Sequence, residues 1–144
     1  MTAPSWQAPL LRLQSDLTVV LERAPMCVAT LPLVTVSEAN RRDRWGRAKR
    51  AKAARTGAHM AIGSEMRRNW PLGGWAGSSL VVLLVRLSPR PLDDDNLASA
   101  LKAVRDGVAD ALGVDDRDAR VGWVVSQERG KAAVRISIYE GRAS

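Results

Sequence analysis

The chain has 144 residues, of which 46% are apolar, enough for one globular domain with a single core but not for two. Its 22 lysines and arginines outnumber its 15 acidic residues, and the net charge of +7 favours a polyanionic partner such as nucleic acid or an anionic membrane surface. The longest apolar run, Leu80–Val85, is too short to cross a bilayer, residues 1–15 lack a signal-peptide pattern and the single Cys27 excludes an internal disulfide, so we expect a cytoplasmic protein that does not enter a membrane.

The first 25 residues fit neither helical nor strand periodicity and are punctuated by Pro4, Pro9 and Pro25. We interpret residues 1–25 as an N-terminal extension that packs on a domain spanning residues 26–144. At the start of this domain, Met26–Val36 is rich in β-branched and apolar side chains, which predicts a strand that breaks or ends near Pro32.

A strongly basic segment follows a predicted helix start at Ser37–Asn40. Like charges one turn apart repel, and binding to DNA phosphates would offset that repulsion, with Trp45 either packed inward or stacked on a base. A solvated helix face is the alternative. The predicted DNA-binding residues are Arg41, Arg42, Arg44, Arg47, Lys49, Arg50, Lys52 and Arg55. Gly57 and Gly63 weaken the helix, which leaves two helices as an alternative to one.

Three strands are predicted in the second half of the chain. Trp70–Gly77 is a loop by its glycine and proline content, and the apolar run Ser79–Leu87 predicts an inner strand with both faces covered. Residues 121–125 and 134–139 alternate between larger apolar and smaller or polar side chains around a turn at 127–131, which predicts a β-hairpin with one buried face. The order strand, helices, strand, helix, hairpin predicts a single α+β domain with a mixed β-sheet.

An acidic helix is predicted between the inner strand and the hairpin. Leu97, Leu101, Val104, Val108 and Leu112 recur at helical spacing, the Asp/Asn cluster of residues 93–96 suits an N-cap, and Gly113 suits a helix end. At about 100° per residue, Asp95, Lys102 and Asp106 fall within roughly 20° of one line. A returning loop could bring Asp115 and Asp116 beside that face.

Clustered carboxylates without histidine or cysteine suit Mg²⁺ or Mn²⁺, because several close carboxylates resist ionising unless a cation lies among them. The alternative gives each helix end one aspartate as a cap or turn residue and pairs Lys102 with Asp106. That alternative does not explain why so many carboxylates gather on one face of a basic protein. We therefore favour a metal site.

The pattern Asp93-Asp94-Asp95-Asn96, Lys102 and Asp106 within one helix, and Asp115-Asp116 before an apolar strand resembles the RusA family of Holliday-junction resolvases. The resemblance covers residues 80–139 and extends more weakly to Leu31–Arg55. It implies a RusA-like fold and a Mg²⁺-dependent homodimeric endonuclease, with Mn²⁺ as a substitute, that nicks four-way DNA junctions in recombination and repair. It also implies catalytic roles for Asp93, Asp95, Lys102 and Asp116, and metal binding by Asp93, Asp95, Asp115 and Asp116. The sequence departs from the family in one respect: Lys102 follows the Asp-Asn pair by about two helical turns instead of about one.

Two other function classes stay open. One is a non-enzymatic DNA-binding protein that uses the basic helix, with the acidic helix contacting a protein partner. The other is a Mg²⁺-dependent phosphotransfer enzyme acting on a small nucleotide. The second class ranks last, because Gly73-Gly74 lacks the Lys-Ser/Thr pair that follows in a phosphate-binding loop.

Overall fold

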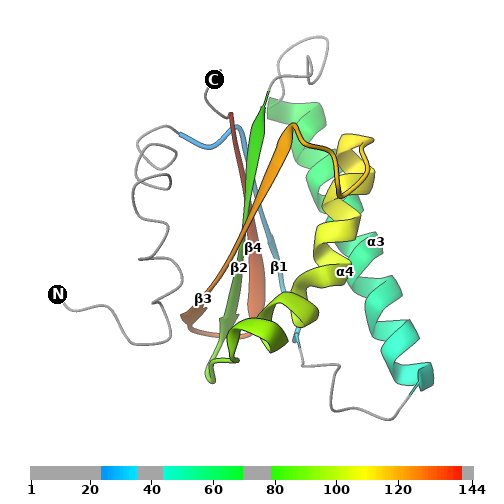
Figure 1. Ribbon diagram of the computed structural model, residues 1–144, viewed down its shortest axis with the longest axis vertical. Helices are drawn as coiled ribbons and strands as arrows, with labels where there is room; N and C mark the ends of the chain where they lie inside the picture. Colours follow the sequence, from blue (N-terminus) through cyan, green and yellow to red (C-terminus); the bar gives the residue numbers. More distant parts are fainter. Residues whose placement is uncertain (1–23, 36–43, 70–78, 141–144) are drawn as a thin grey trace, which may run out of the picture.

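The computed structural model of the chain describes residues 24–35, 44–69 and 79–140. These residues form a four-stranded sheet with two long helices on one of its faces (Figure 1). In chain order the elements are β1 (Cys27–Leu31), α3 (Arg44–Asn69), β2 (Leu80–Ser88), α4 (Asp94–Leu112), β3 (Val121–Arg129) and β4 (Ala133–Glu140). The predicted single α+β domain with a mixed sheet is confirmed, and β1 ends just before Pro32 as expected.

The strand order is β1-β4-β2-β3, with β2 parallel to β3 and antiparallel to β4. The predicted β-hairpin of residues 121–125 and 134–139 is therefore wrong, since β2 lies between the two strands. β2 is a nearly continuous apolar run whose residues are mostly buried, and its central position pairs both of its backbone edges, one with β3 and one with β4. The connection from β3 to β4 passes the end of β2, where the backbone N–H of Gly130 donates to the carbonyl of Ser88 (3.2 Å).

The main core lies between the sheet and the two helices. Leu80, Val82 and Leu84 of β2 face it, and the apolar stripe predicted for α4 is buried there. The stripe consists of Leu97, Leu101, Val104, Val108 and Leu112. Full burial of each such side chain stabilises the fold by roughly 1.5–3 kcal/mol, so this face, and not helix propensity, fixes the orientation of α4.

Helix α3 is continuous over 26 residues, so the alternative of two helices is wrong. Its packing on α4 offsets the cost of two interior glycines. The two helices approach most closely at Gly107 of α4, where a Cβ atom would overlap the carbonyl oxygen of Arg55 and lie 2.8 Å from the Cβ of Ala58. Glycine is needed here because of this close approach.

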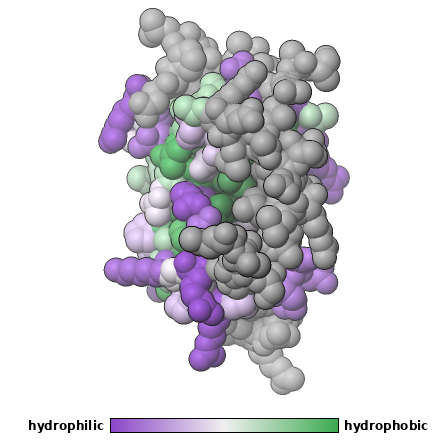
Figure 2. Space-filling model, turned by 90° about the vertical axis from the view of Figure 1, so that its left-hand side faces the viewer, coloured by the Kyte–Doolittle hydropathy of each residue, from purple (hydrophilic) through white to green (hydrophobic). Residues whose placement is uncertain are grey.

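On the opposite face of the sheet, Leu83, Val85 and Tyr139 form a second, smaller buried cluster. Figure 2 looks onto the side of the molecule away from α3 and α4 and shows apolar residues gathered between hydrophilic ones. The predicted helix start at residues 37–40, the loop at 70–77 and nearly all of the extension 1–25 lie outside the described residues. Of the two helices that are described, neither is long and apolar enough to cross a bilayer.

Candidate functional site

The N-terminal end of α4 is capped by Asp93, as predicted. Its backbone is extended (φ −69°, ψ 168°), and its Oδ1 accepts the backbone N–H of Asn96 at 2.9 Å. Its Oδ2 accepts the side-chain amide of Asn96 at 3.0 Å, so both oxygens of this predicted metal ligand take part in the cap. Asp94 and Asp95 are exposed in the first turn, where the helix dipole favours negative charge.

Two buried polar side chains of the sheet hold the segment that enters α4. Gln127 clasps the backbone of Leu92, accepting its N–H at 2.9 Å and donating to its carbonyl at 2.6 Å. Arg86, its neighbour on β2, donates to the carbonyl of Arg90 at 2.8 Å and to the hydroxyl of Thr35 at 2.8 Å. Burial lowers the pKa of the Arg86 guanidinium. Sequence reasoning missed both residues, although each is a polar side chain within or beside an apolar run.

The middle of α4 carries two ion pairs. Lys102 Nζ lies 3.3 Å from Asp106 Oδ2, which is the i,i+4 pairing that the alternative interpretation expected. Arg55 of α3 makes a bidentate contact with Asp110, at 2.6 and 2.9 Å. This hydrogen-bonded pair raises the pKa of Arg55 and holds the pKa of Asp110 below its usual value. One predicted DNA-binding arginine thus also joins α3 to α4.

The C-terminal end of α4 is organised differently, because the contacts there are made to the main chain of the following loop. Gly113 ends the helix in the left-handed conformation (φ 71°), as predicted. Arg105 lies 4.9 Å over the ring of Trp123 and donates to the main-chain carbonyl of Asp116 at 3.0 Å. No sequence pattern predicts this contact between Arg105 and Trp123, because the two residues come from different elements.

The side chains of Asp115 and Asp116 lie against each other. The backbone N–H of Arg117 donates to Asp115 Oδ1 at 2.9 Å, and this bond, followed by a side-chain hydrogen bond with Asp116, lowers the pKa of Asp115. Two neighbouring ionised carboxylates repel each other, and a cation between them would offset that repulsion. Asp115 and Asp116 are therefore the two predicted metal ligands that lie together in the structure.

A depression of about 430 Å³, here called the carboxylate depression, lies beside the C-terminal half of α4. The described residues that line it are Arg55, Lys102, Asp106, Ala109, Asp110, Val114, Asp115 and Asp116. The expectation that a returning loop brings Asp115 and Asp116 beside the Lys102–Asp106 face is therefore confirmed. Asp93 and Asp95 do not line this depression.

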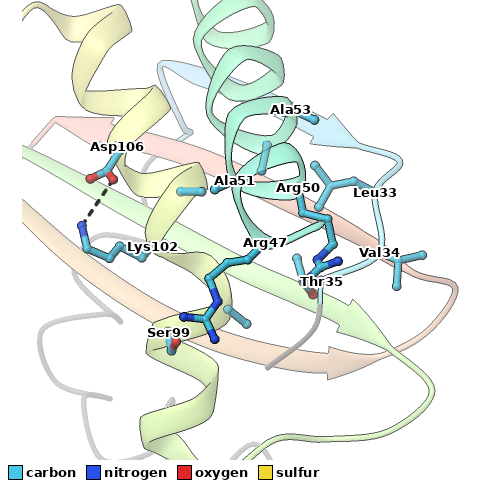
Figure 3. A pocket seen from close by; sticks show the side chains of 13 residues that line it. Leu33, Val34, Thr35, Arg47, Arg50, Ala51, Ala53, Ser99, Lys102 and Asp106 are labelled. Carbon is cyan, nitrogen blue, oxygen red and sulfur yellow. Dashed lines mark hydrogen bonds and ion pairs between the residues drawn. The ribbon is translucent and has the colours of Figure 1, made fainter. Parts of the chain in front are cut away.

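A second cavity, here called the interhelical pocket, has a volume of about 530 Å³ and lies between α3, α4 and the segment after β1 (Figure 3). The described residues that line it are Leu33, Val34, Thr35, Arg47, Arg50, Ala51, Ala53, Ala54, Ser99, Ala100, Lys102, Ala103 and Asp106. Lys102 and Asp106 also line the carboxylate depression, so the two hollows are neighbours on one surface.

The remaining predicted DNA-binding residues surround the first half of α3. Successive positions differ by about 100°, so Arg47, Lys49 and Lys52 point in different directions instead of forming one stripe. Arg44, Arg47, Lys49 and Lys52 are exposed and Arg50 is half-buried, while Arg41 and Arg42 lie outside the described residues. Trp45 is 89% exposed, so the alternative in which it packs inward is wrong.

The predicted metal ligands lie at opposite ends of α4. Its 19 residues would span roughly 28 Å if straight, and although Figure 1 shows the helix bending, its two ends remain well separated. Within residues 24–35, 44–69 and 79–140, no three His, Cys, Asp or Glu side chains are arranged to hold a metal ion. The four predicted ligands therefore do not form one site within a single chain. Mg²⁺ commonly takes only one or two protein carboxylates, however, and the Asp115–Asp116 pair fits that requirement.

No family model matches the chain. A protein of Xylella fastidiosa described as an uncharacterized protein is 42% identical over 87 residues, which cover 54% of this chain and 52% of that protein. The chain thus spans about half the length of this relative, whose description states no activity. The RusA resemblance stays a prediction.

Proposed function

We propose that the chain is a Mg²⁺-dependent endonuclease that nicks branched DNA, with four-way junctions as its substrate. The observation that carries the proposal is the position of the basic helix α3 against the acidic helix α4. The cations of α3 and the carboxylates that follow α4 border neighbouring hollows, which share Lys102 and Asp106. A DNA strand bound by α3 would therefore run close to the Asp115–Asp116 pair.

Phosphate contacts supply the binding. The exposed cations on several sides of α3 repel one another in the free protein, and DNA phosphates relieve that repulsion as counterions are released. The first turn of α3 contains no acidic residue, so the positive end of its dipole adds to the field of Arg44 and Arg47. The exposed ring of Trp45 is available to stack on a base.

The carboxylate depression supplies the reactive end of the site. Asp115 and Asp116 would hold Mg²⁺, which when bound polarises a phosphodiester and stabilises the leaving oxygen. Lys102 places an ammonium group beside the pair and can stabilise charge that develops on the phosphate. Arg105 keeps the loop in place through the main-chain carbonyl of Asp116 while leaving that residue's carboxylate to the site.

A homodimer accounts for the carboxylates at the other end of α4. A twofold axis perpendicular to α4 would place Asp93 and Asp95 of one copy beside Asp115 and Asp116 of its partner, uniting ligands that one chain keeps apart. A four-way junction has near-twofold symmetry, so such a dimer would present two equivalent sites to the two strands that must be nicked. The homodimer is part of this proposal.

The test is incubation of the purified protein with a labelled four-way junction, with Mg²⁺ or with EDTA, beside a fully paired duplex of the same length. We expect symmetric paired nicks in the junction with Mg²⁺, none with EDTA, and little cutting of the duplex. Sedimentation should give a mass near twice 15.6 kDa. Uncut junction in the presence of both Mg²⁺ and Mn²⁺ would contradict the proposal.

A second candidate is a non-enzymatic DNA-binding protein that uses α3. The observation in its favour is that three aspartates have structural partners: Asp93 caps α4, Asp106 pairs with Lys102, and Asp110 pairs with Arg55. This candidate predicts junction binding without cutting and a melting temperature that Mg²⁺ leaves unchanged.

A further inference from the structure

The interhelical pocket exists because α3 and α4 separate after their closest approach. They touch where Gly107 meets Arg55 and Ala58, and Figure 1 shows them diverging toward their N-terminal ends. The walls of the space between them are built mostly of small side chains. These are Ala51, Ala53 and Ala54 on α3 and Ser99, Ala100 and Ala103 on α4. The result is a largely apolar hollow whose volume, about 530 Å³, is in the range of pockets that hold small organic groups.

The charges around this pocket are mainly positive. Arg47 and Arg50 line it from α3 and Lys102 lines it from α4, and Figure 3 shows both arginine side chains reaching toward the space between the helices and Thr35. Asp106 is the one acidic residue among the described residues of the lining, and it pairs with Lys102 at 3.3 Å. A ligand for this pocket should therefore combine an apolar body with a negative charge.

The buried guanidinium of Arg86, next to the pocket lining, also favours a negatively charged ligand. Arg86 is 6% exposed, and the hydrogen bonds described for its guanidinium all go to the neutral oxygens of Thr35 and Arg90. Thr35 lines the pocket, and its hydroxyl accepts from Arg86 Nε at 2.8 Å. The buried guanidinium thus lies one residue behind the pocket lining, where its positive charge adds to that of Arg47 and Arg50.

We propose that the interhelical pocket binds one nucleotide that leaves its base pair at the branch point of the DNA. Its base lies against the alanines and Val34, and its phosphate contacts Arg47 and Arg50. An unpaired nucleotide suits the pocket better than an acidic peptide does, because the pocket shares Lys102 and Asp106 with the carboxylate depression, where a strand continuing from the bound nucleotide would arrive. The inference rests on the proposed action on DNA and adds the feature by which a branch is recognised: stacking is interrupted at a branch point, so a base there costs less to unpair and insert than a base inside a duplex.

The test compares two DNAs in EDTA, so that binding is measured without cutting. Both are duplexes with one extra nucleotide on one strand; in the first the extra nucleotide carries its base, and in the second it is an abasic analogue. The phosphates are the same in both, so α3 contributes equally. We expect the wild-type protein to bind the base-containing DNA about tenfold more tightly, the order expected for packing one base against a protein surface.

Matched leucine substitutions locate the effect. Ala51→Leu and Ser99→Leu change exposed residues of the pocket lining, and they should lower affinity for the base-containing DNA to the abasic level while leaving abasic affinity unchanged. Ala48→Leu and Ala98→Leu change exposed residues of the same helices that do not line the pocket, and they should keep the tenfold preference. All four substitutions introduce leucine, which has a high helix propensity, so we do not expect differences in folding to cause the differences in binding.

The outcomes separate this inference from the proposed function. Equal binding of the two DNAs by the wild-type protein, or a preference that survives both Ala51→Leu and Ser99→Leu, would overturn the nucleotide pocket while DNA binding stands. Failure to bind either DNA would overturn the nucleotide pocket, and failure to bind the four-way junction in EDTA as well would overturn the proposed function with it. A tenfold preference that disappears only in the two lining variants is the result that supports the inference.

Discussion

The two ends of α4 use the same kind of residue for different purposes. At the N-terminal end, both oxygens of Asp93 bond to Asn96, so the carboxylate is part of the fold. At the C-terminal end, Gly113 ends the helix and Arg105 holds the next loop by a main-chain carbonyl, while the side chains of Asp115 and Asp116 meet each other. A carboxylate that caps a helix contributes to stability whatever else it does, whereas two neighbouring carboxylates that cap nothing are available to bind a cation.

The largest expected effect comes from removing ligand charge while keeping side-chain shape. Asp116→Asn should slow junction nicking by about 100-fold or more, as loss of a key electrostatic group does in other enzymes, with binding and melting temperature close to wild type. Asp95→Asn should behave in the same way if the N-terminal carboxylates complete the site. Gel assays of nicking and of binding in EDTA measure the two effects separately. Wild-type nicking by both variants would show that the carboxylates are not catalytic.

The next effect concerns the crossing that holds the two helices together. Gly107→Ala should destabilise the fold by about 1–3 kcal/mol, because the added Cβ overlaps the carbonyl of Arg55 and forces the helices apart. Gly57→Ala is the matched control: nothing lies within 4 Å of its added Cβ, so it should stabilise by up to about 1 kcal/mol. Urea denaturation gives both values. Equal effects of the same sign would show that α3 and α4 do not meet at Gly107.

A smaller effect tests the cap itself. Asp93→Ala removes the acceptors for Asn96 and should cost about 1 kcal/mol of stability, while Asp93→Asn keeps a capping side chain and should cost much less. Asp116→Ala, which caps nothing, should leave stability nearly unchanged. Urea denaturation of the three variants compares the two ends of α4 directly, and a cost at Asp116 as large as that at Asp93 would contradict the contrast drawn between them.

The smallest effect is a pH dependence in the loop after α4. Hydrogen bonds from Arg120 lower the pKa of Asp118 from 3.8 to about 2. Because the folded-state pKa is the lower one, ionised Asp118 stabilises the fold at pH values above its ordinary pKa, and that contribution is lost as the pH falls toward 2. Asp118→Asn should therefore be less stable than wild type at about pH 6, and the difference should shrink by about pH 2.5. Urea midpoints at both pH values check this; a difference that stays constant with pH would refute it.

Local signals in the sequence predicted the elements well. The Asp93 cap, the Gly113 end and the leucine and valine stripe of α4 were predicted from side-chain chemistry that acts within a few residues. The strand order was not, because the choice between a hairpin and a central β2 depends on pairings between strands that are far apart in the sequence. The continuity of α3 likewise depends on its packing against α4.

In the site, too, local features were predicted from the sequence and long-range contacts were not. The sequence predicted that Asp115 and Asp116 return beside Lys102, since a helix end and a short loop leave few other places for them. It could not predict the residues that hold the backbone there: Arg105 over Trp123 joins α4 to β3. The clasp of Gln127 on Leu92 joins residues 35 positions apart. Such contacts depend on the register of the parallel β2–β3 pair, which no local pattern encodes.

The most direct test of the account mixes two inactive proteins. Asp95→Asn and Asp116→Asn are purified separately, mixed under conditions that let subunits exchange, and assayed on the four-way junction with Mg²⁺. If each site draws Asp95 from one copy and Asp116 from the other, a mixed dimer contains one intact site, and random exchange should restore roughly a quarter of the wild-type sites. We expect single nicks to appear in the mixture and in neither variant alone. A mixture as inactive as its components would contradict a site shared between the two ends of α4.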